Sequence, residues 1–236
     1  MRGRELSSWS VAAAMLLAGT WMLHGATLAA GLGRLPGDLG DTRFNLLVLE
    51  HGWRFLHGQG HGSFWSPTWL FWPHANTLAY SHNLVGDWPL YAPFRILGLD
   101  PVHAFGAFLV LCTLGNFVAT LALGRALGLS VLGSAAAASL FAFGMPRVAQ
   151  LGHPQLLPQL WTPLCFLCAT LGWRKWQAGR RNAACVLCAA GLACAALQLA
   201  ASIYLGVLLL IAGASAAPGA AARLGRDRLR AFLGRT

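Results

Sequence analysis

Hydrophobic residues fall into long runs along this chain, and shorter polar stretches separate them. Four of the runs cover residues 10–32, 104–123, 129–145 and 156–173. Each lies within or close to the range of about 17–25 residues that a helix needs to cross a bilayer. A further apolar stretch, 183–217, is too long for one ordinary span and predicts a tight pair that turns near residues 198–202. The pattern predicts an all-α, polytopic transmembrane bundle of about six spans, forming one domain over residues 1–236.

Composition supports a membrane protein. Hydrophobic residues make up 56% of the chain and charged residues 10%, whereas soluble domains average roughly 25% charged residues. The net charge of +10 does not indicate a nucleic-acid partner, because the basic residues lie in short clusters beside apolar runs. Arg2 and Arg4 precede the first run, so a cleaved signal peptide is the alternative to a first span. The length of the run favours the span.

Basic clusters lie on both sides of the last apolar stretch. One cluster lies at residues 174–181, and five arginines follow at residues 223–235. A hairpin between them places both clusters on the same side of the membrane, which the positive-inside rule identifies as cytoplasmic. Both termini are then expected in the cytoplasm. The polar loop 31–103 and the short loop around Arg147 and His153 are expected to face outside.

The external loop, residues 31–103, holds most of the titratable groups. It contains five of the seven acidic residues and six of the eight histidines. Residues 41–58 predict a helix, and its charged residues share one face: Arg43, Glu50, Arg54 and His57. Such a stripe either faces a polar cavity or meets water at the level of the lipid headgroups. A second short interfacial helix is predicted within residues 81–101.

Three further features each have a structural alternative. The tryptophans of FWSPTWLFWPH suit sugar stacking or interfacial anchoring, and anchoring is the better interpretation for most of them. Two CxxC pairs, at 165–168 and 185–188, have zinc-like spacing but lie in apolar runs, where cysteine packs as a small hydrophobe. His57 and His61 are four residues apart, but the glycines of HGQGHG favour a solvated turn over a metal site.

Four segments carry a resemblance to a known family: GDLGDTRFN, LEHGWRFL, FWSPTWLFWPHANTLAYSHNLVGDWPLY and FAFGMPRVAQLGHPQLLP. Over roughly residues 35–175, the chain resembles bacterial multispan proteins related to the glycosyltransferase-C superfamily. The resemblance implies sugar transfer from a polyprenyl-phosphate donor to a glycan, lipid or protein acceptor. It also implies a location in the bacterial inner membrane and, in some members, a divalent metal such as Mg²⁺ or Mn²⁺. Members usually have more spans, so this chain is interpreted as a fragment, a truncated product or a partner subunit.

The same resemblance places an acidic residue near the start of the first external loop, a position that Asp41 or Asp38 matches. Sugar transfer to a hydroxyl needs a base, and Asp41 is our first choice, followed by Asp38. Asp41 is also a candidate metal ligand, and Glu50 is a third catalytic candidate. Contacts to the acceptor and positive charge on the departing phosphate would come from the remaining candidates: Arg43, His51, Arg54, Arg147 and His153.

Two alternatives stand beside this hypothesis. Structurally, Asp41 would cap a helix and Glu50 would pair with Arg54. Functionally, the chain would be a transporter, flippase or assembly subunit for lipid-linked sugars. Transporters place ionisable groups within their spans, whereas these spans offer few polar groups: His24, Asn116 and Gln198. External chemistry is therefore favoured, and Asp41, Glu50 and Arg147 are expected to converge on one external cavity.

Overall fold

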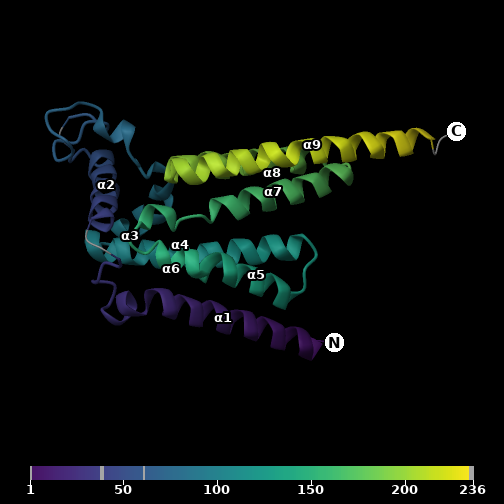
Figure 1. Ribbon diagram of the computed structural model, residues 1–236, viewed down its shortest axis with the longest axis horizontal. Coiled ribbons are helices and arrows are strands. Elements are labelled where there is room, and N and C mark those ends of the chain that lie inside the picture. The colour runs from purple at the N-terminus through teal and green to yellow at the C-terminus, as the bar shows by residue number, and fades with distance from the viewer. Residues whose placement is uncertain (1, 38–39, 61, 234–236) are drawn as a thin grey trace.

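The computed structural model describes residues 2–37, 40–60 and 62–233, and within these ranges the chain is all-helical (Figure 1). The helices are α1 (Arg2–Ala29), α2 (Asp41–Leu56), α3 (Trp88–Ile96), α4 (Pro101–Ala126), α5 (Val131–Phe143), α6 (Met145–Ala149), α7 (Trp161–Gln177), α8 (Arg181–Ala201) and α9 (Ile203–Leu233). Short 3₁₀ turns lie between them: η1 (Thr77–Tyr80), η2 (Val85–Asp87) and η3 (Pro154–Leu156).

Five helical segments in the described part of the chain are long and apolar enough to cross a membrane. They are Glu5–Ala29, Pro101–Ala126, Val131–Ala149, Pro154–Gln177 and Arg181–Ala201. A shorter apolar helix, Ile203–Ala216, follows them. The predicted class, a helical membrane bundle, is confirmed. The sixth crossing stays a prediction.

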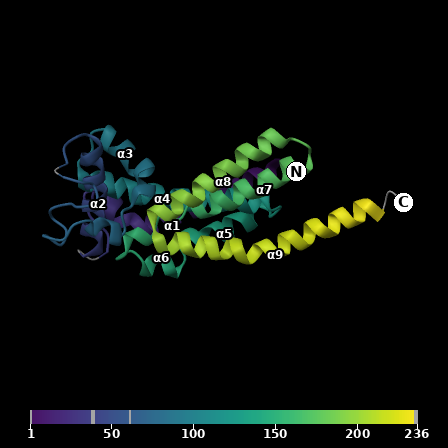
Figure 2. The ribbon, with the colours of Figure 1, turned by 90° about the horizontal axis from the view of Figure 1, so that it is seen from above.

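The long helices lie side by side, and α2 stands across one end of the bundle (Figure 1). Both termini lie at the opposite end, in this view and in the view turned by 90° (Figure 2). Helix α8 ends at Ala201 and α9 begins at Ile203, so the chain reverses within the predicted 198–202 segment. The two helices touch closely there, because a Cβ added to Gly206 would lie 2.4 Å from the Cα of Leu199.

The predicted fourth span begins later than expected, because helix α7 starts at Trp161 rather than near residue 156. Pro158 has no N–H to donate and disfavours helical backbone in the residue before it. Two backbone carbonyls of this non-helical segment accept hydrogen bonds from side chains instead. Asn116 Nδ2 donates to Leu157 O at 2.8 Å, and Gln198 Nε2 donates to Pro158 O at 3.1 Å. Two polar residues of the predicted spans thus supply the hydrogen bonds that the non-helical backbone before α7 lacks.

Small residues bring α7 and α8 close together. A Cβ added to Gly191 would lie 3.3 Å from the Cβ of Cys168, and one added to Gly172 would lie 3.6 Å from the Sγ of Cys188. The cysteines of the two CxxC pairs are free thiols in the structure. Cys168 and Cys188 thus lie where α7 and α8 approach closely, as small residues do between membrane helices, whereas Cys185 is exposed.

Helix α2 is held against the bundle by its apolar side. Val48 and Leu49 are fully buried in a core with residues of α3, α4 and the loop: Leu78, Leu84, Tyr91, Phe105, Phe108 and Leu157. The prediction of a helix within 41–58 is confirmed. The second interfacial helix is shorter than its predicted segment, since α3 ends at Ile96 and Asp100 caps the separate helix α4 through Val102 N at 2.9 Å.

Candidate polar site at the loop end of the bundle

The start of the long loop packs against the short loop that precedes α7. A Cβ added to Gly37 would lie 2.2 Å from Leu151 O, and Gly37 has a φ of +70°, which favours glycine. Thr42 Oγ1 donates to Pro36 O at 2.9 Å and closes this turn onto the first turn of α2. The two loops that were expected on the same side of the membrane therefore meet at the start of α2.

Asp41 lies at this meeting point and accepts hydrogen bonds from the short loop. Its Oδ2 accepts from His153 Nδ1 at 2.6 Å and from Gln155 Nε2 at 2.9 Å. Asn45, one turn along α2, donates to Gln155 Oε1 at 2.7 Å and to Asp41 O at 2.8 Å. The carboxylate and the amide of Gln155 are thus both held in place. Sequence reasoning named Asp41 and His153 but missed Gln155 and Asn45, which carry no motif of their own.

These contacts fix the charge of Asp41. Hydrogen bonds from Gln155 and then from His153 lower the pKa of the Asp41 carboxyl below its usual value, despite a smaller opposing effect of burial. Burial lowers the pKa of His82, and the nearby Asp41 carboxylate opposes this effect. Asp41 is therefore ionised at neutral pH. Its side chain is 41% exposed and that of His153 is 55% exposed, so the pair is accessible from outside the protein.

Asp41 does not serve as the cap of α2. Gly40 occupies the N-cap position, with no side-chain cap hydrogen bond, and Asp41 is the first helical residue. Its carboxylate is used for tertiary contacts to a segment 112 residues away. Asp38, the second candidate, lies outside the described residues.

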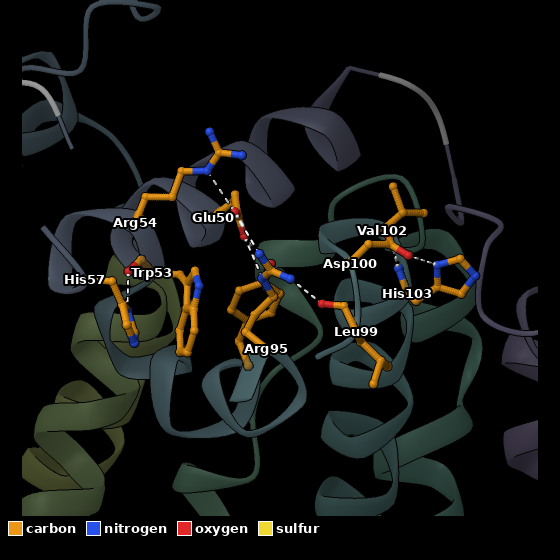
Figure 3. Close-up of polar contacts among 10 residues, drawn as sticks. Glu50, Trp53, Arg54, His57, Arg95, Leu99, Asp100, Val102 and His103 are labelled. Atoms are coloured by element: carbon orange, nitrogen blue, oxygen red, sulfur yellow. Dashed lines mark hydrogen bonds and ion pairs between the residues drawn. The ribbon is translucent and has the colours of Figure 1, made fainter. Parts of the chain in front are cut away.

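Glu50 lies at the centre of a separate polar cluster (Figure 3). Arg54 Nε donates to Glu50 Oε1 at 2.9 Å, and Arg95 of α3 donates through Nε to Oε2 at 2.9 Å and through Nη2 to Oε1 at 3.1 Å. Tyr91 OH adds a third donor at 3.1 Å. Only 8% of the Glu50 side chain is exposed. The predicted Glu50–Arg54 pair is confirmed, and Arg95 and Tyr91 are additions that the spacing within α2 did not reveal.

A cavity of about 310 Å³ opens beside this cluster. Glu50, His51 and Arg54 line it, with residues of the aromatic segment. Asp41 and Arg147 are not among the described residues that line it. Asp41 and Glu50 are nine positions apart on α2, which corresponds to about 14 Å along a helix axis. The two acidic residues of α2 therefore belong to separate polar clusters.

Arg147 forms a third cluster and is almost fully buried, with 6% exposure. Its guanidinium donates to Phe141 O at 2.9 Å and to Leu156 O at 3.1 Å, and it also contacts Gln159. These contacts tie the end of α5 to the segment before α7. Arg43 is exposed on α2. The three residues expected to converge on one cavity, Asp41, Glu50 and Arg147, thus lie in three separate clusters. Arg147 lines a different cavity, of about 220 Å³, with Phe141 and Gln159.

Asp87 is the most unusual carboxyl group that sequence reasoning passed over. It is fully buried in η2, and neither carboxyl oxygen has a hydrogen-bond partner within the described part of the chain. Burial raises the pKa of Asp87 well above its usual value. Its position before Trp88 and Pro89 resembles a helix N-cap in sequence, yet no side-chain cap bond forms. The tertiary burial that isolates it has no local sequence signal.

A divalent metal does not fit the residues described at Asp41. Across residues 2–37, 40–60 and 62–233, no three His, Cys, Asp or Glu side chains gather as metal ligands. The Asp41 oxygen that faces the short loop already accepts two hydrogen bonds. His57 packs on Trp53, with 3.8 Å between ring centroids, and His61 lies outside the described residues.

The fold and these clusters define a helical membrane protein with polar groups gathered at one end of its bundle. No protein-family model, curated protein or solved structure matches the chain.

Proposed function

We propose that this chain is a membrane glycosyltransferase-like protein that transfers a sugar from a polyprenyl-phosphate donor at the external face of the membrane. The observation that carries the proposal is the hydrogen bond of 2.6 Å between His153 Nδ1 and Asp41 Oδ2. It joins two segments that both belong to the family resemblance, GDLGDTRFN and FAFGMPRVAQLGHPQLLP. Both residues are accessible, and both lie at the end of the bundle where α2 crosses it.

The Asp41–His153 pair has the geometry of a base and its orienting partner. Because Nδ1 donates to Asp41, the neutral imidazole carries its lone pair on Nε2. An ionised Asp41 stabilises the imidazolium that forms when Nε2 takes up a proton. Asp41 on its own would be a weak base, since its pKa is lowered. The proposed proton acceptor is therefore His153, and Asp41 orients it.

In this proposal, the acceptor hydroxyl oxygen attacks the anomeric carbon of the sugar. The bond between that carbon and the phosphate oxygen breaks, and polyprenyl phosphate leaves with the electron pair. The hydroxyl proton passes to His153 Nε2 and then to solvent. Of the arginines considered, Arg43 is exposed in the first turn of α2 and is available to the departing phosphate, whereas Arg147 donates to backbone carbonyls.

The competing transporter hypothesis depends on the polar residues of the spans. Asn116 and Gln198 are occupied by backbone groups of the 157–159 segment and by Thr162. Their role is to stabilise an unwound helix start. The third residue, His24, is buried and contacts Thr113 Oγ1 at 2.7 Å. This leaves the loop end of the bundle as the place where chemistry is best supported.

We further infer that the loop end faces outside and that both termini are cytoplasmic. The argument is the two basic clusters, 174–181 and 223–235, which six spans place on one side. In a variant whose native cysteines are replaced, a single cysteine would be introduced either near Gly60 or near Arg228, and intact cells would be treated with a thiol reagent that does not cross the membrane. The cysteine near Gly60 is expected to be labelled, and the cysteine near Arg228 is not. External labelling near Arg228 would contradict six spans.

Radiolabelled sugar transfer tests the proposed activity directly. The purified chain, alone and with neighbouring gene products, would be supplied with a panel of polyprenyl-phosphate sugars. Asp41→Asn is expected to lower transfer by about 100-fold or more, the scale of a lost acid–base group. Asp100→Asn is the matched control, because Asp100 also contacts a histidine, His103, but only as a local helix cap. Equal transfer by wild type and Asp41→Asn, or no transfer with any donor or partner, would overturn the proposal.

A further inference from the structure

The cavity beside Glu50 is lined by residues that have no role in the reaction proposed at Asp41. Its wall has a polar part and an apolar part. Polar groups come from Glu50, His51, Arg54 and Gln59. The apolar wall is formed by residues of α2 and of the neighbouring loop: Leu46, Leu47, Pro67 and Trp69. Its volume of about 310 Å³ is at the lower end of the range of small-molecule sites.

The net charge of the cluster at this cavity is positive. Two arginines, Arg54 and Arg95, share the single carboxylate of Glu50. Each Glu50 oxygen already accepts from two donors, so its charge is offset within the cluster. Arg54 contacts Glu50 through Nε only, and its side chain is 58% exposed. Figure 3 shows the terminal nitrogens of Arg54 directed away from Glu50. They form a fixed fork suited to a phosphate group.

His51 adds an acceptor at the same cavity. Its Nε2 lies 3.0 Å from Phe64 O, and because a carbonyl can only accept, Nε2 carries the hydrogen. The ring is stacked on Phe64, with 5.6 Å between centroids and an interplanar angle of 17°. The lone pair of the neutral ring is therefore on Nδ1, in a ring that is held in position. A ligand with a hydroxyl donor next to its phosphate would match both His51 and Arg54.

The surroundings of the cavity indicate the interface of a membrane. Helix α2 crosses the end of the bundle, roughly perpendicular to the spans in Figure 1. Large apolar side chains of the adjacent loop are exposed, including Trp69 at 42%, Phe71 at 71% and Trp72 at 76%. Tryptophans at the ends of membrane helices sit at the level of the lipid headgroups. Leu47, on the cavity wall, is also 46% exposed, so the cavity continues into an apolar surface.

We propose that the cavity lined by His51, Arg54, Gln59 and Trp69 binds the headgroup of an anionic phospholipid whose headgroup carries a hydroxyl, as in phosphatidylglycerol. Arg54 and Gln59 donate to the phosphate, His51 accepts from the headgroup hydroxyl, and the apolar wall contacts the first carbons of the acyl chains. The distance along α2 separates this lipid from Asp41. The site is therefore independent of the proposed sugar transfer.

Lipid retention in native mass spectrometry tests the proposal. The full chain would be purified in micelles that contain equal amounts of phosphatidylglycerol and phosphatidylcholine. Wild type is expected to retain phosphatidylglycerol preferentially, and Arg54→Gln to retain it at least about tenfold less, as loss of a charge-assisted contact predicts. Arg34→Gln is the matched control, because Arg34 is an exposed arginine of the same external loop outside this cavity. Asp41→Asn is expected to retain the lipid like wild type, whatever its transfer activity.

Three outcomes would overturn the lipid site. Equal loss in Arg54→Gln and Arg34→Gln would indicate only diffuse surface charge. Equal retention of phosphatidylcholine would exclude a preference for anionic lipid. Displacement of the lipid by glycerol 1-phosphate at low millimolar concentration would show a site for free phosphate compounds instead.

Thermal unfolding without lipid checks that Arg54→Gln is folded. Trp69→Ala serves as a second variant, because it changes the apolar wall without touching the Glu50 cluster. The same loss of lipid is expected from it.

Discussion

The two acidic residues of α2, Asp41 in its first turn and Glu50 in its second half, have opposite surroundings. Glu50 is buried and accepts hydrogen bonds from Arg54, Arg95 and Tyr91, two of which lie on α3. Asp41 is 41% exposed, and its partners His153 and Gln155 belong to a loop more than a hundred residues away. One carboxylate is enclosed by donors, and the other is held by them at an accessible surface.

This difference suits Glu50 to stabilising the fold and Asp41 to proton transfer. A carboxylate surrounded by donors on all sides ties elements together but has no lone pair to offer to a substrate. An oriented, ionised carboxylate paired with an exposed histidine can move a proton to and from solvent. Asp87 completes the comparison, because it is buried like Glu50 but has no partner in the described structure.

The largest effect on stability is expected at Glu50. Glu50→Ala leaves Arg95, which is 17% exposed, without its carboxylate partner, and this should lower the free energy of unfolding by about 3 kcal/mol. Asp41→Ala removes only accessible contacts and should change it by about 0.5 kcal/mol. Unfolding in detergent micelles by titration with dodecyl sulfate measures both. Similar losses in the two variants would remove the distinction.

A smaller effect is expected from separating the two loops. Gly37→Ala places a Cβ 2.2 Å from Leu151 O, and the strain should lower the free energy of unfolding by about 2 kcal/mol. It should also reduce sugar transfer, because the loop that carries His153 is pushed away from Asp41. Gly31→Ala is the control, since Gly31 has a φ of +59° but nothing within 4 Å of the added Cβ. If both variants transfer sugar equally, the contact between the loops does not matter for activity.

An effect that depends on pH is expected at Asp87. Its pKa is raised in the folded protein, so folding favours the neutral acid and stability falls as pH rises above the unfolded pKa of about 4. Asp87→Asn mimics the neutral form and should raise the unfolding temperature at pH 8 but leave it nearly unchanged at pH 4. Melting curves at the two pH values test this. A lower unfolding temperature at pH 8 would mean that ionised Asp87 has a stabilising partner.

Much of this architecture follows from the sequence. Uninterrupted apolar runs identify membrane helices because the bilayer imposes length and satisfied backbone groups. The spacing of Glu50 and Arg54 was enough to predict their pairing, since residues four apart share a helix face. Arg95 and Gln155 were not predictable in the same way. Their contacts depend on how α3 and the short loop pack against α2, which no local pattern encodes.

Arg147 shows why the candidate site was predicted only in part. An arginine in a loop beside apolar runs suits phosphate binding, and the same residue type is suited to satisfying several carbonyls at once. In the structure its guanidinium donates to Phe141 O and Leu156 O, contacts that depend on the packing of the loop and not on a local pattern. Asp41 and His153 were both named in advance, yet their pairing appears only in three dimensions.

A double-mutant cycle on sugar transfer tests most directly whether Asp41 and His153 act as one unit. Transfer rates would be measured for wild type, Asp41→Asn, His153→Ala and the double variant, with Asp100→Asn and His103→Ala as the control pair. Each single change at the site is expected to lower transfer by about 100-fold or more, and the double variant should lose little beyond either one, because residues that act together are not additive. Losses that multiply in the double variant, or single variants that transfer sugar like wild type, would contradict a shared proton-transfer role.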